Sequence, residues 1–294
     1  MARKSKSKSG SSLLSRSHPA PRRASLSSKA TRTLIRSHHT LQKKLAQAQK
    51  AGDDAAAHAL RTEIEKKGGL ERYQLASING QTPSRGGDSS RVLMEWLGDV
   101  KSSSSSSPKD AAADSTRKKS LLEVGCLSPD NAVSKSGRFE VTRIDLHSQH
   151  AKILEQDFMQ RPLPTSDDER FDMISLSLVL NYVPDPEGRG QMLQRTTNFL
   201  RTKQQHEEEE EFFPSLFLVL PAPCVTNSRY LDEDRLVAIM QSLGYTCVKR
   251  KLSAKLIYGL WVLGTPPEEK RKVVWKKEEV RAGKRRNNFA VAIK

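Results

Sequence analysis

The sequence predicts an α/β fold, in which a Rossmann-like sheet follows an N-terminal helical extension. Three observations support this prediction. From residue 119 onward, short apolar runs alternate with helix-like segments, a pattern typical of βαβ units and a parallel sheet. The first run ends in Glu123-Val124-Gly125, and the second ends in Asp145, 20 residues after that glycine. Before residue 100, the apolar residues instead recur with the roughly 3.6-residue period of helices.

Length and composition exclude several classes of protein. With 294 residues, of which 36% are hydrophobic and 29% charged, the chain has room for one sizeable domain and an appendage. No apolar run approaches the roughly 20 residues of a membrane span, and the N-terminus lacks the apolar stretch of a secretory signal. Cys126, Cys224 and Cys247 form no C-x-x-C pair, so we expect buried thiols in a reducing compartment. His147 and His150 have no further ligand nearby in the sequence, and we expect no metal site.

The net charge of +16 is concentrated at the two ends of the chain. Residues 1–50 hold 13 Lys and Arg and no acid, and residues 266–294 hold 10 Lys and Arg against 4 acids, which leaves the middle at −3. Basic tails attract polyanions by counterion release, and nucleic acid is the partner that we expect. The alternative is that the tails keep the protein soluble or direct it to the nucleus. Membrane binding is disfavoured because the N-terminal tail lacks the apolar face of an interfacial helix.

Composition divides the chain into four parts. Residues 1–27 are mostly Ser, Lys and Arg and predict a disordered basic tail. Residues 28–100 form the predicted N-terminal helical region. Residues 101–118 contain six consecutive serines and predict a flexible linker. Residues 119–294 make up the predicted Rossmann-like domain, which ends in the basic C-terminal segment.

The helical region begins with a predicted helical hairpin, from about Ala30 to Lys67. Leucines share one face of its first half, Gly52 interrupts the pattern, and Asp53 or Asp54 caps the second half. A helical turn, a Gly-rich loop and a further helix follow. The apolar face of this last helix is formed by Val92, Leu93, Trp96 and Leu97.

The domain after the linker contains five predicted strands and two predicted helices. The strands are Ser120–Val124, Phe139–Leu146, Phe171–Leu180, Ser215–Leu220 and Tyr245–Lys251. The helices are Arg189–Leu200 and Asp232–Leu243. The acidic run Glu207–Glu211 predicts a solvated loop and not a site.

Residues at the ends of the first two strands predict a nucleoside-binding site. A glycine after the first strand, here Gly125, lets the turn approach a ligand closely. An acid about 20 residues further on, here Asp145, accepts hydrogen bonds from ribose hydroxyls. Glu123 adds a carboxylate at the end of the first strand. The alternative is structural, because many βα turns carry Glu-x-Gly and a strand end can carry a surface acid.

A third element, Asp157-Phe158, follows a short apolar run. The Asp157 carboxylate can accept a hydrogen bond from the amine of an adenine while Phe158 covers the ring. The alternative is a loop acid beside a core phenylalanine. The G-x-G-x-x-G fingerprint of NAD enzymes is missing, since Gly125 is followed by Cys-Leu-Ser-Pro. A ligand without pyrophosphate does not need that phosphate cradle, which favours S-adenosylmethionine over NAD.

Several longer stretches are idiosyncratic enough to indicate a family. They are LLEVGCLSPDN, RIDLHSQHAKILEQDFMQRPLP, FDMISLSLVLNYVPDPEGRGQML, LFLVLPAPCVTNSRYL, RRNNFAVAI, GGLERYQLASINGQ and RGGDSSRVLMEWL. These stretches resemble the fungal nucleolar methyltransferases that form 1-methyladenosine in 25S ribosomal RNA. The resemblance covers most of the chain from about residue 35 onward. It implies a class I methyltransferase sheet, S-adenosylmethionine as cofactor, ribosomal RNA in pre-ribosomal particles as partner, and a place in the nucleolus of the nucleus.

The resemblance also assigns cofactor residues. The family's cofactor positions fall on Gly125 and Asp145 of this sequence. By analogy with the wider class of Rossmann-like methyltransferases, Asp157 and Phe158 face the adenine.

This chain departs from that wider class after its first glycine. The class usually has two further glycines there, where this sequence has Leu127 and Pro129. How the methionine end of the cofactor is held is therefore left open. Arg85, beside Gly86-Gly87 in the upstream loop, is suited to bind the cofactor's carboxylate, and an ordinary Gly-rich turn is the alternative.

Asn181 and Tyr182 are the predicted catalytic residues. They begin the stretch Asn-Tyr-Val-Pro at the end of the strand after which base methyltransferases usually hold the substrate base. The stretch loosely resembles the Asn/Asp-Pro-Pro-aromatic motif of enzymes that methylate exocyclic amines. We expect Asn181 to hydrogen-bond an extruded base and Tyr182 to stack on it. The alternative is that Asn181 caps the following helix and Tyr182 packs.

The expected chemistry needs few protein groups. The methyl carbon of a sulfonium is already electrophilic, so the enzyme supplies alignment, desolvation and electrostatics. N1 of adenine carries an in-plane lone pair on the Watson–Crick edge, so the target base must be unpaired or extruded. Two alternatives remain open, a non-catalytic S-adenosylmethionine sensor and a small-molecule methyltransferase, because a fold does not settle a substrate.

Overall fold

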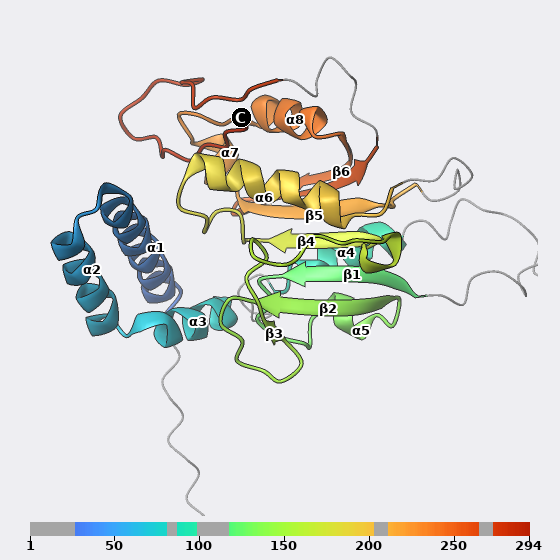
Figure 1. The fold of residues 1–294 in the computed structure, drawn as a ribbon, viewed down its shortest axis with the longest axis horizontal. Coiled ribbons are helices and arrows are strands. Elements are labelled where there is room, and N and C mark those ends of the chain that lie inside the picture. The colour runs from blue at the N-terminus through green and yellow to red at the C-terminus, as the bar shows by residue number, and fades with distance from the viewer. Residues whose placement is uncertain (1–26, 81–86, 99–117, 203–210, 265–272) are drawn as a thin grey trace, which may run out of the picture.

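The computed structural model describes residues 27–80, 87–98, 118–202, 211–264 and 273–294. A seven-stranded sheet carries helices on both faces, and three N-terminal helices lie beside one edge of it (Figure 1). Nearly all of the predicted tail and serine-rich linker, and most of the Glu run, lie outside the described residues. The four-part division of the chain stays a prediction.

Helices and strands alternate through the second half of the chain, as predicted. The helices are α1 (Ser28–Ala51), α2 (Asp54–Lys66), α3 (Gly69–Gly80), α4 (Ser90–Gly98), α5 (Ala132–Lys135), η3 (Asp167–Glu169, a 3-10 turn), α6 (Pro186–Phe199), α7 (Pro223–Thr226) and α8 (Glu233–Ser242). The strands are β1 (Lys119–Val124), β2 (Phe139–Asp145), β3 (Leu154–Glu155), β4 (Met173–Ser177), β5 (Ser215–Pro221), β6 (Tyr245–Leu252) and β7 (Leu256–Leu263).

The sheet has the strand order β3-β2-β1-β4-β5-β7-β6. Strands β1 to β5 pair in parallel, and β7 pairs antiparallel with both β5 and β6. The predicted α/β class, with a Rossmann-like sheet, is therefore confirmed. The order reverses at β1, which has β2 on one side and β4 on the other. In open α/β sheets, ligands bind outside the carboxyl ends of the strands at such a reversal, called a switch point.

Two hydrophobic clusters cover the two faces of the sheet. Alternate side chains of a strand point to opposite faces, so Leu122 of β1 packs toward α6 and α8 while Leu121 packs toward α4 and α5. Both leucines are fully buried. The sheet is thus buried on both sides, which explains why its central strands are continuous apolar runs.

Helix α4 packs on the sheet although the serine-rich stretch separates it from the domain in sequence. Leu93, Trp96 and Leu97 are buried in the same hydrophobic cluster as Leu121 of β1. Trp96 contacts Phe217 of β5 edge to face. Three of the four residues predicted for its apolar face are therefore core residues. Helix α4 and strand β1 therefore belong to one packed unit.

The helical hairpin forms as predicted. Gly52 ends α1 in a left-handed conformation with φ of 71°, a conformation that favours glycine. The Asp53 side chain then accepts a hydrogen bond from the amide of Ala56 at 2.9 Å and caps α2. Helices α1, α2 and α3 contact one another, and Figure 1 shows the arrowheads of β1, β2 and β4 pointing toward them. The three helices therefore stand at the carboxyl edge of the sheet.

The last residues of the chain belong to the core. Phe289 to Ile293 are buried against α6, and a Cβ added to Gly190 would lie 1.8 Å from the carbonyl oxygen of Ala292. Beneath them, the buried Arg189 donates to the carbonyl oxygens of Val183, Pro184 and Ala290. One buried guanidinium therefore ties the segment after β4 to the end of the chain.

The predicted strands differ from the structure in their ends and in their number. The strand predicted as Phe171–Leu180 ends at Ser177, because Leu178 turns the backbone into the left-handed region with φ of 59°. Strands β3 and β7 were not predicted: β3 has only two residues, and β7 returns antiparallel to β6 after a short turn, outside the alternation of strands and helices. Within the described part of the chain, no helix is long and apolar enough to cross a membrane.

Candidate cofactor and substrate site

Backbone hydrogen bonds bring three predicted site residues to one edge of the sheet. The amides of Gly125 and Cys126 donate to the carbonyl oxygen of Ile144 at 2.8 and 3.1 Å, which holds the turn after β1 against the end of β2. The amide of Gln156 donates to the carbonyl oxygen of Asp145 at 2.8 Å, which holds the end of β3 there as well. The turn, Asp145 and the segment that begins with Asp157 therefore meet beside the switch point.

Gly125 occupies a position that no other residue can take without strain. Its φ is 74°, and a Cβ placed there would lie 2.5 Å from Cγ2 of Val179 in the segment after β4. The glycine therefore allows the turn after β1 to approach the turn after β4.

Asp145 presents a half-buried carboxylate at the end of β2. One oxygen, Oδ1, accepts a hydrogen bond from the amide of His147 at 2.9 Å. Burial raises the pKa of Asp145, and the nearby Glu155 carboxylate adds to this increase. Helix α3 covers the loop beyond it, because Gln74 donates to the carbonyl oxygen of His147 at 2.8 Å. A carboxylate in this setting is suited to accept hydrogen bonds from a ribose.

The two residues predicted to face an adenine, Asp157 and Phe158, lie in different environments. Asp157 is half-buried and accepts a hydrogen bond from the amide of Met159 at 2.8 Å, which fixes the turn after β3. Phe158 is 2% exposed and packs on Phe199 of α6, with ring centroids 5.4 Å apart. The expectation that Phe158 covers the cofactor is therefore corrected, because its ring is part of the core cluster. The sequence alone does not show whether an aromatic residue in a loop faces a ligand or packs in the core.

Glu123 supports the turn after β1 through its neighbour Asn131. Its Oε1 accepts a hydrogen bond from Nδ2 of Asn131 at 2.6 Å, and Oδ1 of Asn131 accepts from the amide of Ser134 and caps α5. Burial raises the pKa of the Glu123 carboxyl. In this structure the carboxyl holds the start of α5 next to Gly125.

Part of the upstream Gly-rich loop reaches the same edge. Arg85 lies outside the described residues. A few residues on, Asp88 accepts a hydrogen bond from the amide of Ala132 at 2.5 Å, and the hydroxyls of Ser89 and Ser177 are 2.6 Å apart. The loop therefore contacts both the start of α5 and the end of β4.

The segment after β4 leaves one buried polar atom without a partner. Oδ1 of Asn181 is buried and makes no hydrogen bond with any described residue. Asn181 does not cap α6, because the side chain of Asp185 caps it by accepting from the amide of Gly188 at 2.8 Å. A buried acceptor without a partner costs about 1–3 kcal/mol, so this oxygen is available to a donor from a ligand or from water.

Tyr182 belongs to an aromatic cluster that sequence reasoning missed. Its ring centroid lies 3.9 Å from that of His39 of α1 and 5.7 Å from that of Tyr73 of α3, and Tyr73 stacks on His38 at 4.5 Å. We call His38, His39, Tyr73 and Tyr182 the aromatic cluster. Tyr73 lies within one of the stretches that carry the family resemblance, but contacts between distant elements cannot be read from one sequence.

The aromatic cluster is partly buried. Burial raises the pKa of both Tyr73 and Tyr182. Burial, and then the charges of Lys43 and His38, lower the pKa of His39 to about 4. His39 is therefore a neutral imidazole near pH 7.

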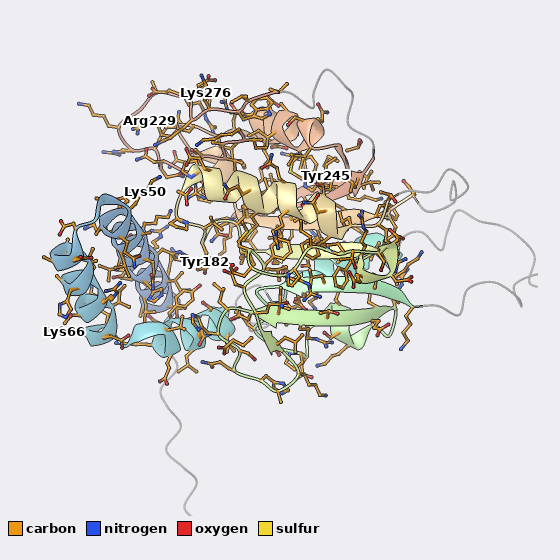
Figure 2. All side chains as sticks on the ribbon, in the orientation of Figure 1. Lys50, Lys66, Tyr182, Arg229, Tyr245 and Lys276 are labelled. Carbon is orange, nitrogen blue, oxygen red and sulfur yellow. The ribbon has the colours of Figure 1, made fainter. Side chains whose placement is uncertain are left out.

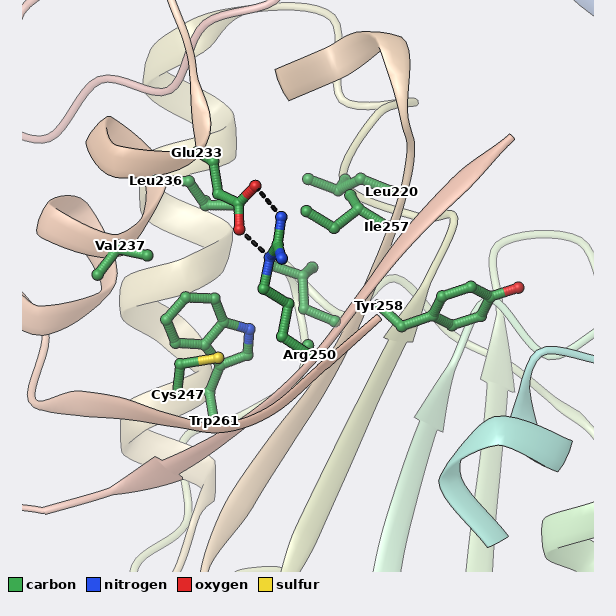
Figure 3. Close-up of a pocket in the computed structure, with 11 residues that line it drawn as sticks. Leu220, Glu233, Leu236, Val237, Cys247, Arg250, Ile257, Tyr258 and Trp261 are labelled. Atoms are coloured by element: carbon green, nitrogen blue, oxygen red, sulfur yellow. Dashed lines mark hydrogen bonds and ion pairs between the residues drawn. The ribbon is translucent and has the colours of Figure 1, made fainter. Parts of the chain in front are cut away.

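A separate pocket lies between α8 and strands β5, β6 and β7 (Figure 3). Its lining is mostly apolar, and its two charged groups, Glu233 and Arg250, pair with each other. Such a lining does not match the hydrogen-bonding needs of an adenosine. Among the described residues, no three His, Cys, Asp or Glu side chains gather as metal ligands.

Comparison with known proteins identifies the family. Residues 58–291 match the family model described as 25S rRNA (adenine(2142)-N(1))-methyltransferase, Bmt2. The chain belongs to this family. The family resemblance seen in the sequence is thereby confirmed, and with it the enzyme class, an rRNA adenine-N1 methyltransferase. Methyltransferases of this kind use S-adenosylmethionine.

Two curated proteins are similar to this chain over most of its length. The 25S rRNA adenine-N(1) methyltransferase of Schizosaccharomyces pombe is 41% identical over 223 residues, which is 76% of either protein. The 25S rRNA (adenine(2142)-N(1))-methyltransferase of Saccharomyces cerevisiae is 36% identical over 260 residues, 87% of this chain and 70% of the relative. Among solved structures, an rRNA methylase from Escherichia coli is similar at 12% identity with a TM-score of 0.33, over 79% of this chain and 77% of that chain.

The partly buried His39 predicts that acid weakens the folded state. Its pKa is about 4 when folded and about 6.5 when unfolded, so the unfolded chain binds the extra proton between these values. Stability should fall by about 1–3 kcal/mol as the pH drops from 6.5 to 4. The substitution His39→Phe keeps an aromatic ring and should remove most of this loss, measured by urea unfolding at both pH values. His58→Phe, at an exposed position of α2, is the control, and an equal acid loss in all three proteins would contradict the account.

Proposed function

We propose that this chain forms 1-methyladenosine in large-subunit ribosomal RNA at the carboxyl edge of its sheet, around the switch point between β1 and β4. Membership of the Bmt2 family supports the reaction. The observation that carries the assignment of the site is the buried oxygen of Asn181, an acceptor without a partner among the described residues beside that switch point. The substrate is made in the nucleolus, so we place the protein there, acting on pre-ribosomal particles.

The proposed cofactor site uses the ends of β1, β2 and β3. The turn at Gly125 lies under the cofactor, Asp145 accepts from its ribose hydroxyls, and Asp157 accepts from the amine of its adenine. Glu123 acts through Asn131 by holding the turn and the start of α5 in place. Arg85 remains a proposed partner of the cofactor's carboxylate. S-adenosylmethionine supplies an electrophilic methyl group when it is bound.

The proposed base site uses Asn181 and the aromatic cluster. The exocyclic amine of an adenine can donate to Oδ1 of Asn181, which satisfies the buried acceptor and orients the neighbouring N1. The N1 lone pair lies in the ring plane and needs positioning rather than activation. Because His39 already contacts the ring of Tyr182, we propose that the base packs against the cluster as a whole and not against Tyr182 alone.

Two other functions would use the same cofactor site. A non-catalytic S-adenosylmethionine sensor and a small-molecule methyltransferase both need the residues around Gly125 and Asp145. Neither needs a basic N-terminal region. The six Lys and Arg of α1, which contains no acid, therefore favour an RNA substrate.

The assignment of Asp145 predicts a loss of cofactor binding when its carboxylate is removed. Asp145→Ala removes two hydrogen bonds to the ribose, so affinity for S-adenosylhomocysteine should fall about 10- to 150-fold by calorimetry. The control is Glu140→Ala, which removes an exposed carboxylate from the opposite end of the same strand, β2. Wild-type affinity in folded Asp145→Ala would refute the site. Gly125→Arg is a less clean test, because its side chain would clash with Val179 whether or not a cofactor binds there.

The assignment of Asn181 predicts an effect on rate. Asn181→Ala should lower kcat for RNA methylation roughly 10- to 100-fold and leave the affinity for S-adenosylhomocysteine unchanged, because the amide positions the base and not the cofactor. Asn198→Ala, on the exposed side of α6, is the control. An unchanged kcat, or a loss confined to cofactor affinity, would remove Asn181 from the base site.

A further inference from the structure

The three N-terminal helices enclose a groove that shares only His38 with the proposed active site. It lies between α1, the end of α2 and the start of α3. We call it the basic groove. Its polar lining includes Lys29, Ser37, His38, Lys66, Lys67 and Arg72.

The charge of the basic groove has one sign. Four of its lining residues are Lys or Arg and none is an acid. Lys67 also pairs with Glu63 at 2.8 Å, which offsets part of its charge, whereas Lys29, Lys66 and Arg72 are exposed. At least three cations can therefore face a polyanion across the groove.

Two helix N-termini border the same groove, and the Glu65 carboxylate lies close to the second of them at Gly69. Ser27, the N-cap of α1, and Gly69, the first residue of α3, both line it. The first amide groups of a helix and the positive end of its macrodipole attract anions. Lys66 and Lys67 offset the opposite, negative end of α2. Backbone and side chains therefore favour the same kind of ligand.

Ring contacts of the aromatic cluster link the basic groove to the proposed base site. His38 lines the groove and stacks on Tyr73, and Tyr73 contacts Tyr182 beside Asn181. Figure 2 shows Lys66 on the helical group and Tyr182 between that group and the sheet. A strand lying in the groove would therefore have a path across the aromatic cluster to the reacting base.

We propose that the basic groove binds the phosphate backbone of the RNA that flanks the target adenine. This inference rests on the proposed function and adds a binding surface to it. The chain's own N-terminal tail is a poor occupant, because residues 1–26 carry seven Lys and Arg and no acid. An acidic peptide would match the charge but not the lining, where hydroxyls and the His38 ring beside Leu34 and Leu41 suit ribose and base.

The test compares a variant that lacks two exposed charges of the groove with a variant that lacks two exposed charges elsewhere. The groove variant is Lys29→Gln with Lys66→Gln, and the control is Lys118→Gln with Lys135→Gln, near the start of β1 and at the end of α5. Affinity for unmodified large-subunit rRNA is measured at several salt concentrations. Affinity of the groove variant should fall about tenfold at low salt, and the slope of log K against log salt should decrease in magnitude by about 1 to 2. Its affinity for S-adenosylhomocysteine should equal that of the wild type.

Three results would overturn the inference, and each differs from a failure of the proposed function. The groove is not an RNA site if both variants bind RNA as tightly as the wild type does, or if both lose affinity to the same extent. It is also not an RNA site if the groove variant loses affinity for polyglutamate but not for RNA. The proposed function itself fails if the wild type binds S-adenosylhomocysteine but does not methylate rRNA.

Discussion

The contact between the ring of Tyr182 and the N-terminal helices is the interaction on which the rest of the site depends. It joins the segment after β4 to His39 of α1 and Tyr73 of α3. The same docking lays α3 over the loop beyond Asp145 through Gln74. It also sets the basic groove beside the carboxyl edge of the sheet. The helical region is therefore part of the proposed site and not an appendage.

Arg189 holds the C-terminal end of the segment that carries Asn181 and Tyr182. This buried guanidinium donates to Val183, Pro184 and Ala290, and burial lowers its pKa to about 10. Three carbonyl acceptors and the face of a phenylalanine ring, 4.4 Å away, compensate for the burial of its charge. The C-terminal residues thus help to fix the proposed base site, although their basic composition suggested a role with RNA.

Local patterns explain what the sequence predicted correctly. Alternating apolar runs indicated the parallel sheet, and the acid 20 residues after Gly125 follows from the length of one βα unit. Phe158 was misassigned because a phenylalanine in a loop reads the same whether it faces a ligand or the core. His39 and Tyr73 were missed because they approach Tyr182 across more than 100 residues of chain, a contact that no periodicity encodes. The cap of α6 by Asp185 and the unpartnered oxygen of Asn181 likewise required coordinates.

The central claim is that this edge of the sheet directs a methyl group to a ring nitrogen of adenine in ribosomal RNA. The most direct test incubates the protein with unmodified large-subunit rRNA and isotopically labelled S-adenosylmethionine, digests the RNA to nucleosides, and identifies the labelled product by mass and retention. The account predicts 1-methyladenosine. Label in the amine-methylated isomer of adenosine or in methylated cytidine would contradict it, as would the absence of label from a protein that binds S-adenosylhomocysteine.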